Sequence, residues 1–471
     1  MYKIVQLDDV YGRLYDKGFG YIMQHMKSPF DRDPQSVPLM RFMLHSNSLS
    51  NEILTGGSPA HRLVKLNSFK EVEIMPLPIA DDEIRKILNA NGLVLTEYSS
   101  DELSVALKAS DGSIHNVVSP FTKRLPENLW APIISDSRVV LADLFASSIC
   151  DYLVVGVTEP SLKCKVAGDN IITAEQALEL VRILLTAHNR YYISAELTVN
   201  EGFYYLYRFK RLFKEFQYAW TVATYAQGKG LSEKIYDYLD SLGRRLEFIC
   251  RAYDKVAFFS LKTANHDVQN NQLYHLAYFV MLITGVFDDL AHIIEEFYYI
   301  RIKRRMNISL RIPPNEKPKK FYQEIQSKNA ALYEFLTAPD TQRDINVFYP
   351  IRDSLQHREL LKGILYSKDS EMEKNVFELS RETAESLKMI SDALTYIVSW
   401  DPLCLLDPLP FIKWAQKVTI TLVNRVLSSI DWDSFCATLP IDIQDKIHAS
   451  NESFKQGVGQ FLGWPKEPLY F

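Results

Sequence analysis

Apolar residues in the second half of the chain recur every three or four positions, which is the spacing of one face of an α-helix. Thr173 and Gln176 have the spacing of a capping box before the first such stretch. Long helices bury such faces against each other, so we expect an antiparallel bundle. The pattern predicts helices at 174–187, 202–227, 231–256, 266–301, 321–335 and 372–397, with shorter ones outside the bundle at 410–429 and 442–454.

The first 165 residues show a different pattern of short apolar runs separated by prolines and turn residues. We predict strands at 63–75, 92–98 and 103–108, and a turn at Asp111-Gly112 before a returning strand that ends at Val118. A short helix should begin at Asp81 or Asp82 and end before Gly92.

These patterns predict an α+β protein in three parts, since 471 residues exceed one ordinary core. We expect a mixed α/β domain over residues 1–167 and a mainly α-helical bundle over 168–400. A C-terminal helical extension over 401–471 should pack on the bundle.

The amino-acid composition bears on the cellular compartment of the protein. Five scattered cysteines without a Cys-x-x-Cys pair argue against disulfides and structural zinc, and they fit a reducing compartment, so we expect the cytoplasm. The longest apolar run, Leu276 to Phe287, is shorter than the roughly 20 residues of a membrane span. We interpret it as a buried helix and expect no membrane association.

Few sequence motifs indicate a cofactor or a metal. The chain has no Walker loop, dinucleotide fingerprint, nucleophile elbow or His-Glu-x-x-His motif, so we expect no cofactor. Four acids surround His292, but no second His or Cys completes a metal site. We expect these acids on helix surfaces, with at most one reaching toward His357: Asp288, Asp289, Glu295 and Glu296.

The candidate chemistry lies in Arg352-Asp353-Ser354-Leu355-Gln356-His357, which follows Pro350. Pro350 suits the first turn of a helix. Arg352 and Asp353 would then lie where free backbone N–H groups and the helix dipole attract phosphate. Asp353 is four residues before His357, so its carboxylate could orient the imidazole. The alternative is a surface salt-bridge cluster at a helix start.

This spacing of an arginine, four residues and a histidine resembles the motif of the HEPN superfamily, a group of helical bundles. The resemblance covers about residues 203–400. It implies a homodimer whose two motifs meet at the interface. In active members it implies metal-independent RNA cleavage, with the histidine transferring a proton at the 2'-hydroxyl and the arginine holding the phosphate. Arg352, Asp353 and His357 would then be the catalytic residues of an endoribonuclease.

A second pair, Arg182 and His188, also fits the motif. We discount it because Ile183 follows the arginine and no acid lies one turn before His188. The later motif is favoured by its place just before the predicted final helix at 372–397.

A basic segment lies one element before the motif. Residues 301–320 carry eight basic side chains and one acid, Glu316, a local charge of +7 on a chain whose net charge is -5. One interpretation is a phosphate-backbone contact surface. The other is a solvated helix end whose cations face the C-terminal dipole, which would not explain Lys317 to Lys320. The candidate nucleic-acid-binding residues are Arg301, Lys303, Arg304, Arg305, Arg311, Lys317, Lys319, Lys320 and Arg358.

Aromatic and basic residues also alternate from Phe203 to Phe213, a pattern that can stack bases. At helical spacing we favour core aromatics with a basic outer face. Our first hypothesis is therefore a HEPN-like protein that engages RNA through the Arg352 motif. The alternative is a non-catalytic helical interaction module whose N-terminal domain recognises a protein partner.

Overall fold

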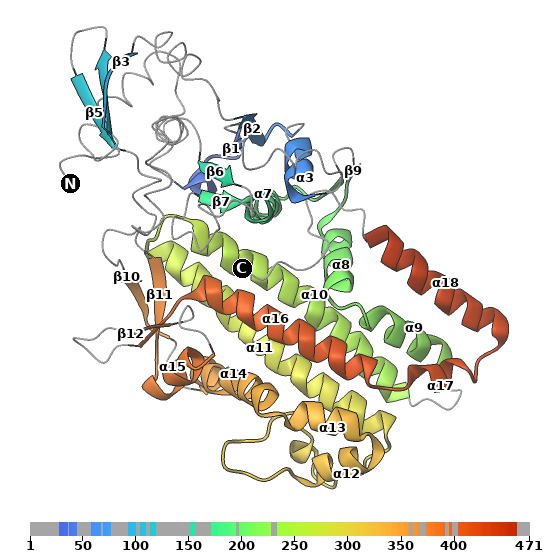
Figure 1. The fold of residues 1–471 in the computed structure, drawn as a ribbon. Coiled ribbons are helices and arrows are strands. Elements are labelled where there is room, and N and C mark those ends of the chain that lie inside the picture. Colours follow the sequence, from blue (N-terminus) through green and yellow to red (C-terminus); the bar gives the residue numbers. More distant parts are fainter. Residues whose placement is uncertain are drawn as a thin grey trace. The chain divides into compact units, whose positions relative to one another are not determined.

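The protein, seen here in a computed structural model, divides into two compact units (Figure 1). The first comprises residues 1–198 with 462–465, and the second 199–461 with 466–471. The division follows Thr198 rather than residue 167, so the helix at 174–187 belongs to the first unit. The structure describes residues 28–35, 37–44, 58–66, 69–76, 93–99, 104–109, 114–118, 151–155, 171–194, 197–227, 233–357, 361–366, 374–390, 395–397 and 404–458.

A parallel sheet forms the centre of the first unit. Its strands β1 (Met40–Leu44), β2 (Val72–Pro76), β6 (Tyr152–Val155) and β7 (Ile171–Thr173) lie in the order β2-β1-β6-β7. Helix α3 (Pro59–Lys65) falls in the β1–β2 connection, as parallel strands require a crossover. Helix α7 (Ala174–Ala187) follows β7 directly and begins with the predicted capping box.

The remaining predictions for the first unit had mixed outcomes. Strands β3 (Leu93–Ser99), β4 (Ser104–Ala109) and β5 (Ile114–Val118) lie where strands were predicted, and they form an antiparallel meander. A short antiparallel pair, β8 (Tyr192–Ser194) and β9 (Leu197–Thr198), follows α7. The expected strand at 63–75 is wrong at its start, which is the end of α3. The helix expected before Gly92 lies outside the described residues.

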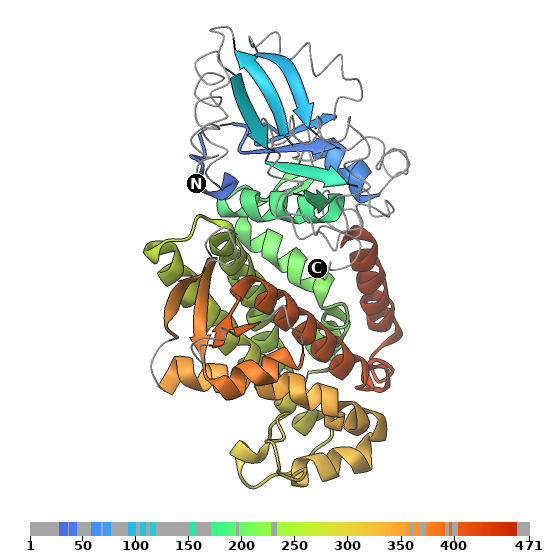
Figure 2. The ribbon, with the colours of Figure 1, turned by 60° about the vertical axis from the view of Figure 1, so that its left-hand side comes forward.

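The second unit is built on an antiparallel pair of long helices, α10 (Glu233–Leu261) and α11 (His266–Phe297). Helix α16 (Pro408–Ser428) packs along both (Figure 2). We expected this helix outside the bundle, but its apolar face is part of the core, with Phe411, Ala415 and Val423 fully buried. Further helices of this unit are α8 (Glu201–Leu212), α9 (Phe216–Ala226), α12 (Lys320–Lys328), α13 (Ala330–Thr337), α14 (Pro339–His357), α17 (Trp432–Cys436) and α18 (Ile441–Val458).

Helix α11 is the most apolar of these elements. In the described part of the chain it alone is long and apolar enough to cross a membrane, and 72% of its most apolar window is buried inside the protein. Leu276, Phe279, Ile283 and Phe287 are completely buried, which confirms the predicted buried helix. A single helix of this kind is weak evidence for a membrane, because a core helix shows the same pattern.

The predicted long helix at 372–397 is wrong. The chain forms a small antiparallel sheet in the order β10-β11-β13-β12, interrupted by helix α15 (Arg381–Lys388). Ser380 caps α15, and the buried positions before it lie on a strand. Thr383 and Leu387 are buried as expected, but on a helix of only two turns. The strands are β10 (Gly363–Tyr366), β11 (Lys374–Leu379), β12 (Thr395–Ile397) and β13 (Cys404–Leu406).

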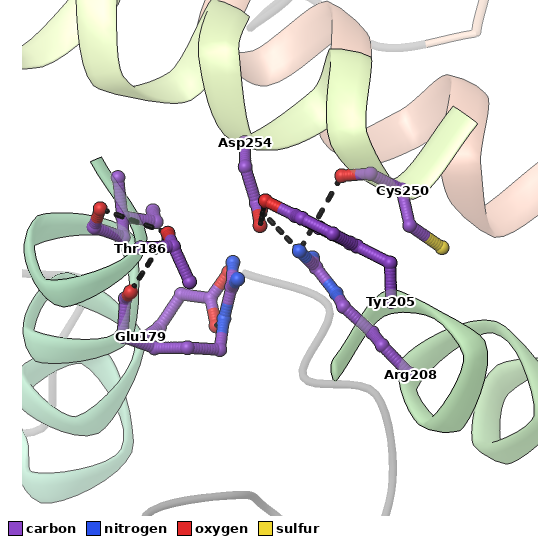
Figure 3. Close-up of polar contacts among 8 residues, drawn as sticks. Glu179, Thr186, Tyr205, Arg208, Cys250 and Asp254 are labelled. Atoms are coloured by element: carbon purple, nitrogen blue, oxygen red, sulfur yellow. Dashed lines mark hydrogen bonds and ion pairs between the residues drawn. The ribbon is translucent and has the colours of Figure 1, made fainter. Parts of the chain in front are cut away.

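Helix α8 contributes aromatic side chains to the core, as predicted, but its cations are not all on an outer face. Tyr204, Tyr205 and Phe209 are buried, and so is Arg208. Arg208 forms an ion pair with Asp254 of α10, and the Tyr205 hydroxyl donates to the same carboxylate over 3.0 Å (Figure 3). The aromatic and basic pattern therefore reflects a buried, neutralised charge pair.

The second arginine that fits the motif lies on α7 of the first unit. Arg182 is buried, and its Nε donates to Glu179 Oε2 over 2.6 Å. Thr186 in turn donates to the carbonyl oxygen of Arg182. These contacts make Arg182 a structural residue of α7, in agreement with our decision to discount it.

Candidate nucleic-acid interface

Arg352 lies near the end of helix α14, which differs from the predicted first turn. The helix begins at Pro339, and Pro350 lies inside it. Pro339 and Asp340 supply the start signal that we had assigned to Pro350. Free backbone N–H groups and the positive end of the helix dipole are therefore not available to a phosphate at Arg352.

Arg352 and Asp353 bind each other. The Nε and Nη2 atoms of Arg352 donate to Asp353 Oδ1 over 3.0 and 2.7 Å. Both side chains are partly exposed, as in the salt-bridge alternative. The backbone of His357 ends α14, but its side chain and all of Arg358 lie outside the described residues. The predicted orientation of His357 by Asp353 stays a prediction.

The basic segment is held in place by α14. The side chain of Gln342 donates to the carbonyl oxygen of Leu310 over 2.9 Å and accepts from the amide of Ile312 over 2.8 Å. One turn later, Asn346 donates to the carbonyl oxygen of Ile312 over 2.8 Å and accepts from Arg311 Nε over 2.9 Å. Four hydrogen bonds from two side chains thus hold the backbone at Leu310 and Ile312 and orient Arg311.

Tyr349 brings the basic segment and the arginine motif together. The guanidinium carbons of Arg311 and Arg352 lie 4.5 and 4.8 Å from the centroid of its ring. Each of the two guanidinium groups therefore makes a cation–π contact with the ring of Tyr349. Burial raises the pKa of Tyr349 to about 12, with Asp288 adding to the rise and the two arginines opposing it. The phenol is therefore neutral at physiological pH.

Most cations of the basic segment have no carboxylate partner among the residues that the structure describes. Lys319 pairs with Glu316 over 3.5 Å, and Arg305 donates to the hydroxyl of Tyr238. Helix α11 ends at Phe297, four residues before Arg301, so the helix-end interpretation stays open for Arg301 to Arg305 and does not extend to Lys317 to Lys320. Among the described residues, no carboxylate pairs with Arg301, Lys303, Arg304, Arg311, Lys317 or Lys320.

The same segment forms a shallow pocket. Arg311, Lys317 and Lys319 line it together with Ser309 and the hydroxyl-bearing Tyr322. Its volume of about 20 Å³ is enough for a group the size of a water molecule. The Tyr322 hydroxyl already donates to the carbonyl oxygen of Leu310 over 2.6 Å, so the three cations are the groups that a phosphate oxygen would meet here.

The four acids around His292 take different roles. Asp289 accepts from Arg245 Nε over 2.9 Å and from the Ser241 hydroxyl over 3.2 Å, both on α10. Burial raises the pKa of Asp288, and the positive charge of Arg352 opposes the rise.

The other two acids form ordinary pairs. Glu295 contacts His292 Nδ1 over 3.1 Å, and Glu296 binds Lys234 over 2.8 Å. In the described ranges no group of three His, Cys, Asp or Glu side chains could hold a metal ion.

The sequence analysis did not identify Tyr349, Gln342, Asn346 or Arg245 as part of this region. The spacing of Gln342 and Asn346 was the one available signal, because two amides one turn apart can hold a neighbouring loop. No protein-family model, curated protein or solved structure matches this chain.

Proposed function

We propose that the second unit binds RNA through phosphate contacts made by the basic segment, residues 301–320. The supporting observation is a segment of charge +7 whose backbone is held at Leu310 and Ile312 by Gln342 and Asn346. Ordered cations without carboxylate partners lose little when they bind phosphate, since no ion pair has to be broken. Release of counterions from the RNA would drive such binding.

Arg352 extends this surface. It shares the ring of Tyr349 with Arg311, so a chain whose phosphate reaches Arg311 passes close to the motif. Cleavage is the second part of the proposal, and it rests on the family resemblance of Arg352 and His357. The internal pair of Arg352 with Asp353 would have to open, or shift, for Arg352 to hold a phosphate in a bidentate manner.

The binding proposal is tested by fluorescence anisotropy with a labelled single-stranded RNA at several salt concentrations. In the double variant Lys317→Gln and Lys320→Gln, two exposed lysines lose their charge. Each phosphate contact contributes about 0.7 to the salt slope of a single strand. We therefore expect the slope to fall by about 1.4 and the affinity at 0.15 M salt to fall roughly tenfold.

The matched control is the double variant Lys388→Gln and Lys446→Gln, which removes the same charge from α15 and α18 of the same unit. It should bind like the wild type. Equal losses in both variants would mean that only the net charge matters. Absence of binding by the wild type at 0.05 M salt would refute the proposal and favour the interaction module.

Cleavage is tested separately by incubating the protein with total RNA in EDTA. His357→Ala and Arg352→Lys should each reduce cleavage by about a hundredfold or more, as expected for loss of a general acid–base or of charge stabilisation. Cleavage that survives in His357→Ala, or stops only because of the chelator, would contradict this mechanism. The binding proposal would stand in either case.

A further inference from the structure

A tight turn in the basic segment brings cations from both of its sides to one pocket. The backbone N–H of Glu316 donates to the carbonyl oxygen of Pro313 over 3.1 Å, which closes the turn. Asn315, just before the closing residue, has a φ of 68°, in the left-handed region that asparagine tolerates. The chain reverses direction here. The cations that line the pocket are Arg311 before the turn and Lys317 and Lys319 after it.

The wall of the pocket is held in place by neighbouring side chains. Tyr322 is buried, and besides its hydrogen bond to Leu310 its hydroxyl accepts from Gln342 Nε2 over 3.2 Å. Arg311 is held through its Nε, which donates to Asn346. Its two terminal Nη groups have no hydrogen-bond acceptor among the residues that the structure describes, so they remain for a ligand.

The charge around the pocket matches a doubly charged anion. Glu316 pairs with Lys319 over 3.5 Å, so three cations and one acid leave a net charge of +2. A phosphodiester carries one negative charge, whereas a phosphate monoester carries about -1.5 to -2 at pH 7. No side chain caps α12, the helix that begins after Lys319, so its first backbone N–H groups add to the positive potential.

The size of the pocket favours the end of a nucleic-acid strand over its interior. Its volume of about 20 Å³ admits a single oxygen atom of a phosphate. A phosphodiester that inserts one of its two unesterified oxygens has one left for the surrounding cations. A terminal phosphate has three such oxygens, so two remain for Lys317 and Lys319, which are exposed at the rim.

We propose that this pocket binds the terminal phosphate of an RNA strand, a phosphate monoester at its 5' or 3' end. The inference rests on the proposed function and adds a substrate class, which is RNA that ends in a phosphate rather than in a hydroxyl. The following phosphodiesters contact cations of the segment outside the pocket, among them Arg304 and Lys320. A phosphopeptide offers the same monoester but would leave those cations without a partner.

The test measures anisotropy of labelled single-stranded RNAs with the full chain at 0.15 M salt. One 12-nucleotide sequence is prepared with a 5'-phosphate, with a 3'-phosphate and with hydroxyl ends. A 14-nucleotide RNA with hydroxyl ends carries two extra phosphodiester charges and controls for charge alone. We expect one of the phosphorylated RNAs to bind about tenfold more tightly than both hydroxyl-ended RNAs, as for one to three charge-assisted hydrogen bonds.

Two double variants separate the pocket from the rest of the segment. In Lys317→Gln with Lys319→Gln, the preference for the phosphorylated RNA should fall from about tenfold to below about threefold. The matched control, Lys303→Gln with Lys320→Gln, removes the same charge from residues that do not line the pocket. It should weaken the binding of every RNA alike and keep the preference.

Three outcomes would overturn the inference. Equal binding of phosphorylated and hydroxyl-ended RNA, with weaker binding after Lys317→Gln and Lys320→Gln, would remove the terminal-phosphate site and leave the proposed function intact. Displacement of the phosphorylated RNA by an equal concentration of inorganic phosphate would assign the pocket to the free anion. If the wild type binds no RNA, both proposals fail, and a phosphoserine peptide that binds more tightly than its unphosphorylated form would assign the pocket to a protein partner.

Discussion

The substitution Asp289→Asn should stabilise the protein near neutral pH. Burial raises the pKa of Asp289 from 3.8 to about 6, although Arg245 and Ser241 both favour its charged form. Its side chain is only 9% exposed, so little solvent screens this effect. Asparagine keeps an oxygen that can accept from Arg245 and Ser241, and it removes the cost of the buried charge.

The magnitude follows from the two pKa values. Between pH 4 and pH 6 the folded chain holds a proton that the unfolded chain has lost, so the free energy of unfolding falls as pH rises through this range. Above about pH 6 the full penalty applies. The shift from 3.8 to about 6 corresponds to about 3 kcal/mol at 1.36 kcal/mol for each pKa unit. For a unit of this size, that is about 5–10 °C in the unfolding midpoint.

The assay is thermal unfolding of the full chain, followed by circular dichroism from pH 4.5 to pH 7.5. The gain from Asp289→Asn should be largest at pH 7.5 and fall to about 1 kcal/mol at pH 4.5, where most of the unfolded-state carboxyl is still ionised. Asp240→Asn, which removes the exposed partner of Arg244, is the matched control and should change stability by less than about 1 kcal/mol. A gain that is absent at pH 7.5, or equal at both pH values, would refute the argument from the buried charge.

Three further predictions concern the core, the basic segment and association. Phe348→Ala should cost about 3–5 kcal/mol in urea unfolding, because its buried ring stacks on Trp414 at 5.3 Å; a loss below 1 kcal/mol would show that the cavity collapses. Gln342→Ala should increase hydrogen exchange at the Ile312 amide, because the amide loses its acceptor. Unchanged protection would show that the loop keeps its structure without this hydrogen bond. By light scattering at micromolar concentration the protein should be a dimer, and a strict monomer would count against the cleavage hypothesis.

Much of the helical architecture could be predicted from the sequence, because each long helix carries one continuous apolar face. Ile235, Leu242, Leu246 and Ile249 are buried on α10 as the spacing indicates. The region after residue 372 could not be predicted in this way. The buried positions 376, 379, 383 and 387 are spaced like one face of a single helix. The same positions fit a strand followed by a capped helix equally well. The capping role of Ser380 was the local signal that separates these alternatives.

The candidate site was predicted in composition but not in geometry. Arg352 and the cations of the basic segment were identified, and the structure brings Arg311 and Arg352 to one ring. Their shared partner, Tyr349, could not be found by spacing, because the contact joins residues about 40 positions apart. The start of α14 was misplaced because Pro339 and Pro350 both suit a first turn, and only tertiary packing selects between them.

The amide ties between α14 and the basic segment have a thermodynamic consequence for any ligand. Ordering a loop backbone costs about 1–2 kcal/mol for each residue, and a disordered basic arm loses that amount when it binds. Here Leu310, Ile312 and the guanidinium of Arg311 are already fixed by Gln342 and Asn346. Calorimetry should therefore show that binding an anion costs the protein little conformational entropy. The association rate should be limited by diffusional encounter rather than by folding of the segment.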